Sequence, residues 1–356
     1  MLYELFGKGI NIGGWLSQWN CVPVPPVEEE EMKKHFQEFI TEENIKQIAG
    51  WGMDHVRLPV DYRVFEKSPS SLEFNREGFY FIDLCADWCQ KYGLNLILDL
   101  HDMEGNVYGA MESPMPLLTE EGLKKKFCRI WEEITLHFLG RKAPVIMFEL
   151  LNEVSDGSGY LWNELCRQAV KVIRNIDKDR YILIGSNEQN SAFRLKELQL
   201  WEDDKVFYNF HFYDPQAFTH QRAHFSEEML LYNKEIHYPG EITGFTDFLL
   251  SNRKYIPKYA RVCMEDRVDK ESMRRLLKDA FDFVKYTDRE LYCGEFGVIT
   301  AARPQDAAAW LKDVMELLDE QRIGHAIWNY KELDFGFVNM ENETVSNLII
   351  KELFDK

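Results

Sequence analysis

Two glutamates stand at the ends of two short apolar segments. The first segment, Val145–Glu153, reads Val-Ile-Met-Phe-Glu-Leu-Leu-Asn-Glu and carries Asn152 and Glu153 at its end. The second segment, Leu291–Gly297, reads Leu-Tyr-Cys-Gly-Glu-Phe-Gly and carries Glu295. Apolar runs of this kind are typical of strands buried on both faces of a parallel sheet. Barrel enzymes keep their reacting groups at the C-terminal ends of such strands.

Two carboxyl groups that face one cleft form the set that splits a glycosidic bond. In the retaining mechanism one carboxylic acid protonates the leaving oxygen and the other carboxylate attacks the sugar, at a separation of about 5–5.5 Å. Glu153 and Glu295 are far apart in the sequence, but two strands of a closed barrel can direct both toward one centre. A single glutamate would more simply be a surface or ion-paired carboxylate. Two of them at the ends of apolar strands favour catalysis.

The rest of the chain alternates short apolar runs with longer amphipathic segments. This alternation predicts an α/β fold of the (β/α)₈ type, the TIM barrel. The expected strands are Lys8–Gly14, His55–Val60 (ended by Pro59), Asn95–His101, Val145–Glu153, Tyr181–Ser186, Lys205–Tyr213, Leu291–Gly297 and Gly324–Tyr330. The expected helices are Thr41–Gly50, Glu77–Tyr92, Glu120–Gly140, Gly159–Ile176, Ala192–Leu198, Glu271–Tyr286, Pro304–Gln321 and Asn342–Phe354.

One region, residues 214–270, interrupts the alternation. It is too long for a simple connection between a strand and a helix, and it is rich in aromatic residues such as Phe218, Phe225 and Tyr232. We therefore expect one domain, residues 1–356, with a small helical cap subdomain inserted after strand six at residues 214–270. A cap in that place would line the cleft at the C-terminal face of the barrel.

Composition narrows the class of partner. The 42 basic and 60 acidic residues give a net charge of −18, which argues against nucleic acid and anionic membranes and fits a neutral substrate. Aromatic residues make up 14% of the chain, and rings can stack on sugars, although core packing explains most of them.

The N-terminal residues and the cysteines bear on location. The first residues contain no basic segment followed by a long apolar run, so we expect a cytoplasmic protein, or a secreted one if a leader has been trimmed. No apolar stretch is long enough to span a membrane. Seven cysteines scattered through expected strands and helices indicate reduced thiols rather than a disulfide framework. Cys85 and Cys89 lack a second pair that would complete a zinc site. We also expect a monomer.

Short motifs carry further polar or aromatic residues to the expected strand ends. They are Arg57 in Val-Arg-Leu-Pro, His101 in Leu-Asp-Leu-His, Asn152 and Glu153 in Glu-Leu-Leu-Asn-Glu, His211 and Tyr213 in Asn-Phe-His-Phe-Tyr, Glu295 in Gly-Glu-Phe-Gly, and Trp328 in Ala-Ile-Trp-Asn-Tyr. In this order the motifs resemble glycoside hydrolase family 5, the cellulase family, over nearly the whole chain. The similarity is closest to the compact clostridial endoglucanase C type, which also carries a cap after strand six, beginning Phe-Thr-His-Gln as at Phe218–Gln221.

The resemblance implies a retaining (β/α)₈ enzyme with Glu153 as acid/base and Glu295 as nucleophile. Asn152 would hydrogen-bond the sugar 2-hydroxyl, a contact that strengthens in the transition state. Arg57 and Tyr213 would donate hydrogen bonds to Glu295 and favour its ionised form.

Four further residues are candidates for substrate binding. His101 and His211 would bind sugar hydroxyls or the acid/base, and Trp328 would provide a stacking surface under the sugar next to the cleaved bond. Trp15 is a weaker candidate for such a platform. Taken singly, a histidine or tryptophan is more often a core residue, so only the order of the motifs favours these roles.

The function expected from these residues is that of a retaining endo-β-1,4-glucanase acting on cellulose-like or mixed-linkage β-glucans, with no metal or organic cofactor. His220 and His224 have a spacing that could bind a metal on a helix, but we interpret them as cap residues. Within the enzyme class the alternative is an exo-acting β-glycosidase, or a mannanase or mannosidase acting on oligosaccharides. Transglycosylation through the same covalent intermediate stays open. From another class, the alternative is a carbohydrate-binding barrel without activity, which would gain nothing from keeping both glutamates.

Overall fold

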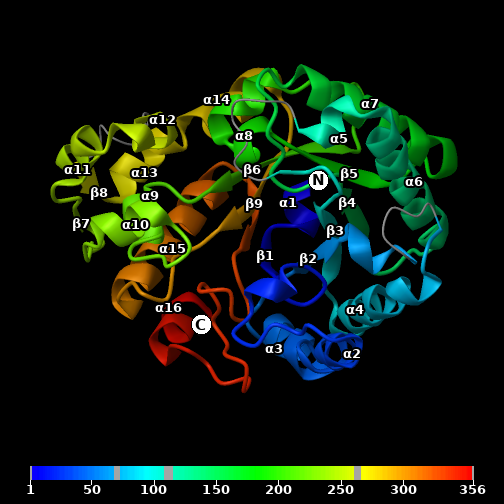
Figure 1. Ribbon diagram of the computed structural model, residues 1–356, viewed down its shortest axis with the longest axis horizontal. Helices are drawn as coiled ribbons and strands as arrows, with labels where there is room; N and C mark the ends of the chain where they lie inside the picture. The colour runs from blue at the N-terminus through cyan, green and yellow to red at the C-terminus, as the bar shows by residue number, and fades with distance from the viewer. Residues whose placement is uncertain (1, 68–72, 108–114, 260–265, 355–356) are drawn as a thin grey trace.

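A computed structural model describes residues 2–67, 73–107, 115–259 and 266–354, in which eight parallel strands close into a barrel (Figure 1). The strands are β1 (Lys8–Asn11), β2 (His55–Asp61), β3 (Asn95–Asp102), β4 (Ile146–Glu149), β5 (Tyr181–Gly185), β6 (Val206–Phe212), β9 (Leu291–Phe296) and β10 (Gly324–Ile327). Their order around the barrel is β1-β10-β9-β6-β5-β4-β3-β2. The predicted (β/α)₈ architecture is confirmed.

Helices surround the barrel, and several begin or end at the residues that the sequence indicates. Thr41 caps α3 in a capping box with Asn44, and Gly93 closes α4 with a φ of 75°. The helices outside the cap region are α1 (Leu2–Leu5), α2 (Glu29–Glu38), α3 (Glu42–Gly50), α4 (Phe79–Tyr92), α5 (Pro116–Thr119), α6 (Glu121–His137), α7 (Tyr160–Ile176), α8 (Asn187–Asn190), α14 (Lys278–Thr287), α15 (Pro304–Glu320) and α16 (Asn347–Phe354). Among the described residues, no helix combines the length and apolar character that a membrane span requires.

Some predicted boundaries are wrong. Strand β4 ends at Glu149 rather than at Glu153, and Pro59 lies inside β2, paired with Asp99, instead of ending it. The predicted helix Glu271–Tyr286 is two helices, α13 (Lys270–Leu276) and α14, and α16 begins at Asn347 rather than Asn342. Beyond β4 the chain stays anchored to its neighbours through single backbone hydrogen bonds, which an apolar sequence pattern cannot distinguish from a continuing strand.

The barrel interior changes from apolar to polar along the strands. At the N-terminal end, α1 closes the barrel, and one apolar layer is formed by Leu2, Phe6, Ile97, Met147, Leu183, Phe207, Tyr292 and Ala326. Side chains on one face of a strand recur every second residue, so the next inward layer lies two residues further on. That layer brings Asp99, Glu149 and Asn209 into the barrel, all fully buried. Polar groups inside a barrel must be paired, and here they meet beneath the C-terminal face of the barrel.

The segment between β6 and β9 lies to one side of the barrel, in green and yellow in Figure 1. It contains α9 (Gln216–Thr219), α10 (Glu227–Tyr232), α11 (Phe245–Ser251), α12 (Ile256–Tyr259) and α13, with a two-stranded antiparallel sheet of β7 (Gly240–Glu241) and β8 (Arg267–Val268). The segment is largely helical, as expected, and the small sheet was not anticipated. Residues 260–265 lie outside the described residues, and the status of the segment as a separate subdomain stays a prediction.

Candidate active site

The structure brings Glu153 and Glu295 together at the C-terminal face of the barrel. Glu295 lies in β9, and Glu153 follows β4 with a φ of +46°, a left-handed conformation that is uncommon outside glycine. One carboxylate oxygen of Glu153 and one of Glu295 lie within 4.8 Å of each other. This close approach fits the pair of a retaining glycosidase, whose carboxyl groups lie about 5–5.5 Å apart.

Arg57 lies at the centre of the polar layer and is fully buried. Its Nη1 donates to Glu295 Oε1 at 2.8 Å, and its Nε donates to Glu149 Oε2 at 2.6 Å. Its Nη2 lies 3.0 Å from Asp99 Oδ2. One guanidinium therefore faces three buried acids. Burial raises the pKa of Asp99 to about 7, against the opposing effect of Arg57.

A β-bulge at Gly294 orients Glu295. The register of β9 shifts at this point against both β6 and β10. The Gly294 N–H donates to Asn209 Oδ1 at 2.7 Å, and Asn11 Nδ2 donates to the Gly294 carbonyl at 3.0 Å. A Cβ on residue 294 would lie 2.6 Å from Asn209 Nδ2, so only glycine fits. Bulges re-aim side chains, and this one turns Glu295 toward Arg57.

The second oxygen of Glu295 accepts a hydrogen bond from Tyr213. The Tyr213 hydroxyl lies 2.9 Å from Glu295 Oε2. Burial first, and then the charge of Glu295, hold the pKa of Tyr213 well above its usual value, so the phenol keeps the proton that it donates. Each oxygen of Glu295 is thus held by one donor, as the sequence motifs imply, and the carboxylate is oriented in a fixed plane.

Glu153 has the surroundings of a proton donor. Its Oε1 lies 2.9 Å from His211 Nδ1, and its side chain is 20% exposed. Burial raises the pKa of Glu153 to about 7, with smaller opposing effects of His101 and Arg57. Near neutral pH a large fraction of Glu153 therefore carries the proton that a general acid needs.

We expect kcat/KM to fall as the pH rises through about 7, because Glu153 must be protonated to act as the acid. The drop should approach tenfold per pH unit above that value. Glu153→Gln should lower kcat/KM on β-glucan by about 10²–10⁴-fold and remove this alkaline limb from the residual activity. Initial rates across pH 5–9 test this, with Glu241→Gln on the exposed cap as control; an unchanged limb in Glu153→Gln would assign the titration to another group.

His101 and Trp328 pack against each other beside the two glutamates. Their rings stack with centroids 5.6 Å apart and an interplanar angle of 7°, and His101 Nδ1 lies 2.7 Å from Asp99 Oδ2. A Cβ on Gly13 would lie 2.6 Å from the Trp328 ring, so glycine at that position makes room for it. The Trp328 side chain is nearly buried, with 6% of its surface exposed.

Comparison with known proteins agrees with this geometry. The family model described as cellulase (glycosyl hydrolase family 5) matches residues 21–334. This chain belongs to glycosyl hydrolase family 5. Endoglucanase C of Acetivibrio thermocellus is 39% identical over 348 residues, which cover 98% of each chain. Cellodextrinase A of Ruminococcus flavefaciens is 33% identical over 89% of this chain and 83% of that protein. Thermotoga maritima Cel5A, solved with cellobiose, has the same fold, with a TM-score of 0.74 at 23% identity over 98% of both chains.

Membership in family 5 confirms the predicted glycoside hydrolase, and the family is retaining. In this family 5 chain the structure places the motif residues around one centre. Arg57 and Tyr213 donate hydrogen bonds to Glu295, and Arg57 also donates to Asn152. His211 contacts Glu153. The roles of the individual residues stay predictions that the geometry supports.

The prediction for Trp15 is wrong. Its ring is fully buried, its Nε1 donates to the Phe36 carbonyl at 2.9 Å, and it stacks on Trp88. Gly14 precedes it with a φ of +85°, so the chain turns there and sends the ring into the core between barrel and helices. Trp15 therefore cannot offer a face to a sugar.

Sequence reasoning missed the buried polar residues that support the site. These are Asn11, Asp99, Glu149, Asn190 and Asn209, each fully buried. A signal for some of them was present, because Asp99 and Glu149 are charged residues inside otherwise apolar strands. A buried charge must be paired, so each of them implied a partner in the barrel.

Three of the predicted site residues also have ligand atoms that could hold a metal ion. Within the described ranges, Glu153, His211 and Glu295 are a group whose ligand atoms lie close together. His211 is engaged with Glu153, and Glu295 is paired with Arg57, so we assign the three to acid–base chemistry. His220 and His224 do not form a joint site, because His224 Nε2 pairs with Asp334 while the His220 ring packs on Tyr213.

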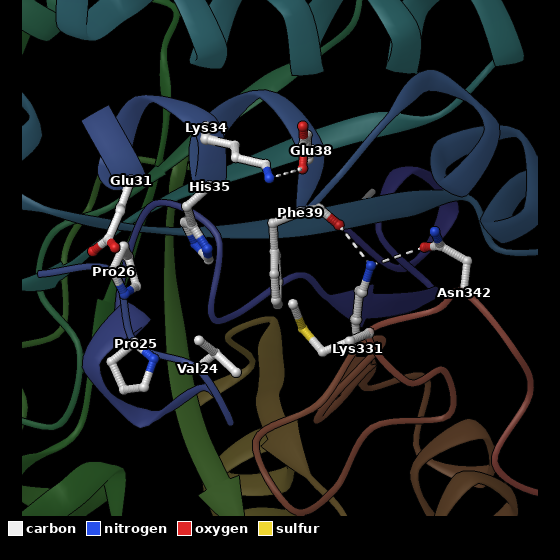
Figure 2. A pocket seen from close by; sticks show the side chains of 11 residues that line it. Val24, Pro25, Pro26, Glu31, Lys34, His35, Glu38, Phe39, Lys331 and Asn342 are labelled. Carbon is white, nitrogen blue, oxygen red and sulfur yellow. Dashed lines mark hydrogen bonds and ion pairs between the residues drawn. The ribbon is translucent and has the colours of Figure 1, made fainter. Parts of the chain in front are cut away.

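A separate cavity of about 530 Å³ lies between the segment after β1 and the loop after β10. Figure 2 shows Lys331 reaching into this region, where its Nζ donates to the Phe39 carbonyl at 3.0 Å and to Asn342 Oδ1 at 2.8 Å. Neither Glu153 nor Glu295 lines the cavity, so it is not the reaction centre.

Proposed function

We propose that the protein is a retaining endo-β-1,4-glucanase that hydrolyses β-1,4 bonds in cellulose-like or mixed-linkage β-glucans by double displacement. The approach of the Glu153 and Glu295 carboxylates to within 4.8 Å carries this proposal. The 39% identity to an endoglucanase over 98% of both chains supports the substrate class.

In the first step, Glu295 attacks the anomeric carbon as Glu153 protonates the departing glycosidic oxygen. Arg57 and Tyr213 hold both oxygens of Glu295, so the carboxylate reaches the carbon without losing its orientation. The C–O bond to the leaving sugar breaks, and an ester bond to Glu295 forms. Glu153 is left ionised, next to the His211 Nδ1.

In the second step, Glu153 works in the opposite direction. It takes a proton from a water molecule as the oxygen of that water attacks the anomeric carbon, and the ester bond to Glu295 breaks. The configuration is inverted twice, so the product keeps the β-anomer. Glu153 is protonated again and Glu295 is again ionised.

Asn152 is oriented for the sugar 2-hydroxyl. Arg57 Nη2 donates to Asn152 Oδ1 at 2.9 Å, which fixes the amide and makes Nδ2 the group that can donate to the substrate. A hydrogen bond at the 2-hydroxyl strengthens as positive charge develops on the ring, so it favours the transition state over the bound substrate.

One contact favours a second candidate, an exo-acting β-glycosidase. His224 of the cap pairs with Asp334 of the loop after β10 at 2.9 Å, and Phe335 beside it packs on Tyr213. A connection between two loops at the edge of the site narrows that edge, and a cleft closed at one end becomes a pocket for chain termini.

The product profile over time separates the two activities. With soluble β-1,4-glucan and mixed-linkage β-glucan, we expect a rapid fall in viscosity and oligomers of several lengths, with mannan as the control. Monosaccharide released at nearly constant viscosity would support the exo-acting enzyme instead. Proton NMR of the first product should show the β-anomer, and an initial α-anomer would exclude double displacement by Glu295.

A further inference from the structure

The short segment α8 (Asn187–Asn190), which follows β5, is a left-handed turn rather than a regular helix. Glu188, Gln189 and Asn190 have φ values of 53°, 58° and 56°, so three successive residues that are not glycine adopt the left-handed conformation. Each such residue costs free energy and persists only where its surroundings hold it. The Gln189 N–H donates to the Val154 carbonyl at 3.1 Å, which ties the turn to the residue after Glu153.

The turn places the Asn190 side chain inside the barrel. Asn190 is fully buried, and a Cβ on Gly185 would lie 2.4 Å from Asn190 Oδ1, so the glycine in β5 leaves the space that this amide occupies. Asn190 Nδ2 lies 3.0 Å from His211 Nε2. The other ring nitrogen of His211, Nδ1, lies 2.9 Å from Glu153 Oε1 and 3.6 Å from Glu295 Oε2.

This contact decides which nitrogen of His211 carries the proton. The Asn190 amide nitrogen can only donate to Nε2, and the carboxylates of Glu153 and Glu295 that face Nδ1 accept from it, so the two contacts together place the ring proton on Nδ1. Burial lowers the pKa of His211 to about 4, which keeps the ring neutral near pH 7. A neutral ring carries one proton, on either Nδ1 or Nε2. The neutral ring then presents an N–H group to Glu153.

We propose that Asn190 is a positioning residue that fixes the tautomer of His211 and so directs the Nδ1–H group at the acid/base, Glu153. The inference rests on the proposed function for its catalytic meaning. The hydrogen bond from His211 to Glu153 becomes stronger as Glu153 gives up its proton to the leaving group, because a carboxylate accepts a stronger hydrogen bond than a carboxylic acid. The interaction therefore favours the transition state for proton transfer.

The other charged or titratable groups that act on His211 are unchanged by substitutions at Asn190. They are Glu153, Glu295, Arg57, Glu149 and His101. Replacing Asn190 by glycine therefore tests the donor to Nε2 and leaves the charges around the ring in place, whereas aspartate adds a carboxylate beside Nε2.

Asn190→Gly is the informative variant, because glycine adopts a φ of +56° at little cost and only the amide is lost. Gln189→Gly is the matched control, because Gln189 precedes Asn190 and has the same left-handed backbone conformation. We expect Asn190→Gly to lose about 10–100-fold in kcat/KM on phenyl β-cellobioside, whose leaving group needs a proton. On 2,4-dinitrophenyl β-cellobioside, which leaves without one, it should stay within about threefold of wild type. Equal losses on both substrates would overturn the proposal, since a structural defect does not depend on the leaving group.

Nitrogen-15 NMR of the histidine side chains tests the tautomer without using activity. The spectrum at pH 7 should show His211 protonated on Nδ1 in wild type, with the signal assigned by its loss in His211→Gln. In Asn190→Asp, whose carboxylate accepts, the proton should appear on Nε2. A proton on Nε2 in wild type would refute the inference. If wild type fails to cleave β-glucan but shows the Nδ1 proton, the proposed function fails and the positioning role does not.

Discussion

Glu295→Ala should lower kcat on β-glucan by on the order of 10⁴-fold or more and leave the fold intact. The substitution removes the nucleophile, so the covalent glycosyl-enzyme cannot form. Arg57 keeps its ion pairs with Glu149 and Asp99, so the polar layer retains its central cation and its other partners. Rates from reducing-sugar release, together with thermal unfolding, measure the two effects separately.

Azide sharpens this test, because a small anion can enter the space left by the carboxylate. We expect azide to restore turnover of 2,4-dinitrophenyl β-cellobioside by Glu295→Ala, with an α-glycosyl azide as the product, since the displacement inverts the configuration once. Azide should do nothing for wild type. A β-glycosyl azide from Glu295→Ala would assign the role of nucleophile to a different group.

Arg57→Leu should produce the largest loss of stability among single substitutions in the barrel. It leaves Glu149, Asp99 and Glu295 without their shared cation in the interior, and breaking a buried ion pair costs about 3–5 kcal/mol. Urea unfolding at pH 7 measures the loss. The matched control is Arg129→Leu, since Arg129 pairs with Glu132 and Glu133 at the surface and should cost about 1 kcal/mol or less.

The loss of stability caused by Arg57→Leu should become larger as the pH rises. Without the cation, burial raises the pKa values of the unpaired acids in the folded state above their unfolded values. The folded protein then binds more protons than the unfolded chain, so the variant gains stability as the pH falls and loses it as the pH rises. A deficit relative to wild type that stays constant from pH 7 to pH 5 would show that lost packing, not unpaired charge, dominates.

The sequence was sufficient for the barrel because its signals are local and repeated. Each strand is a short apolar run, and helix limits such as Thr41 and Gly93 are set by cap residues that the sequence displays. The end of β4 could not be predicted in this way. Leu150 and Leu151 are as apolar as the strand before them, and only the hydrogen bonds of the neighbouring strands decide that the ladder stops at Glu149.

Some residues of the candidate site could likewise be predicted from local sequence signals, and others could not. Glu153 and Glu295 could be predicted because a charged residue after an apolar run is visible in the sequence. Asn190 could not, because its importance comes from a left-handed turn and from the space beside Gly185, both of which exist only in the folded chain. Trp15 shows the opposite error, since an aromatic residue near a strand end is equally compatible with core and surface.

The polar layer around Arg57 also bears on how the protein refolds. Its members come from six of the eight strands, namely Asn11, Arg57, Asp99, Glu149, Asn209 and Glu295. A half-barrel ending after β4 would hold Asn11, Arg57, Asp99 and Glu149 but would lack Asn209 and Glu295. The rate at which activity returns after dilution from denaturant therefore reports the rate at which the barrel closes. Folding intermediates that bury apolar surface without joining β9 to β10 and β6 should show no activity.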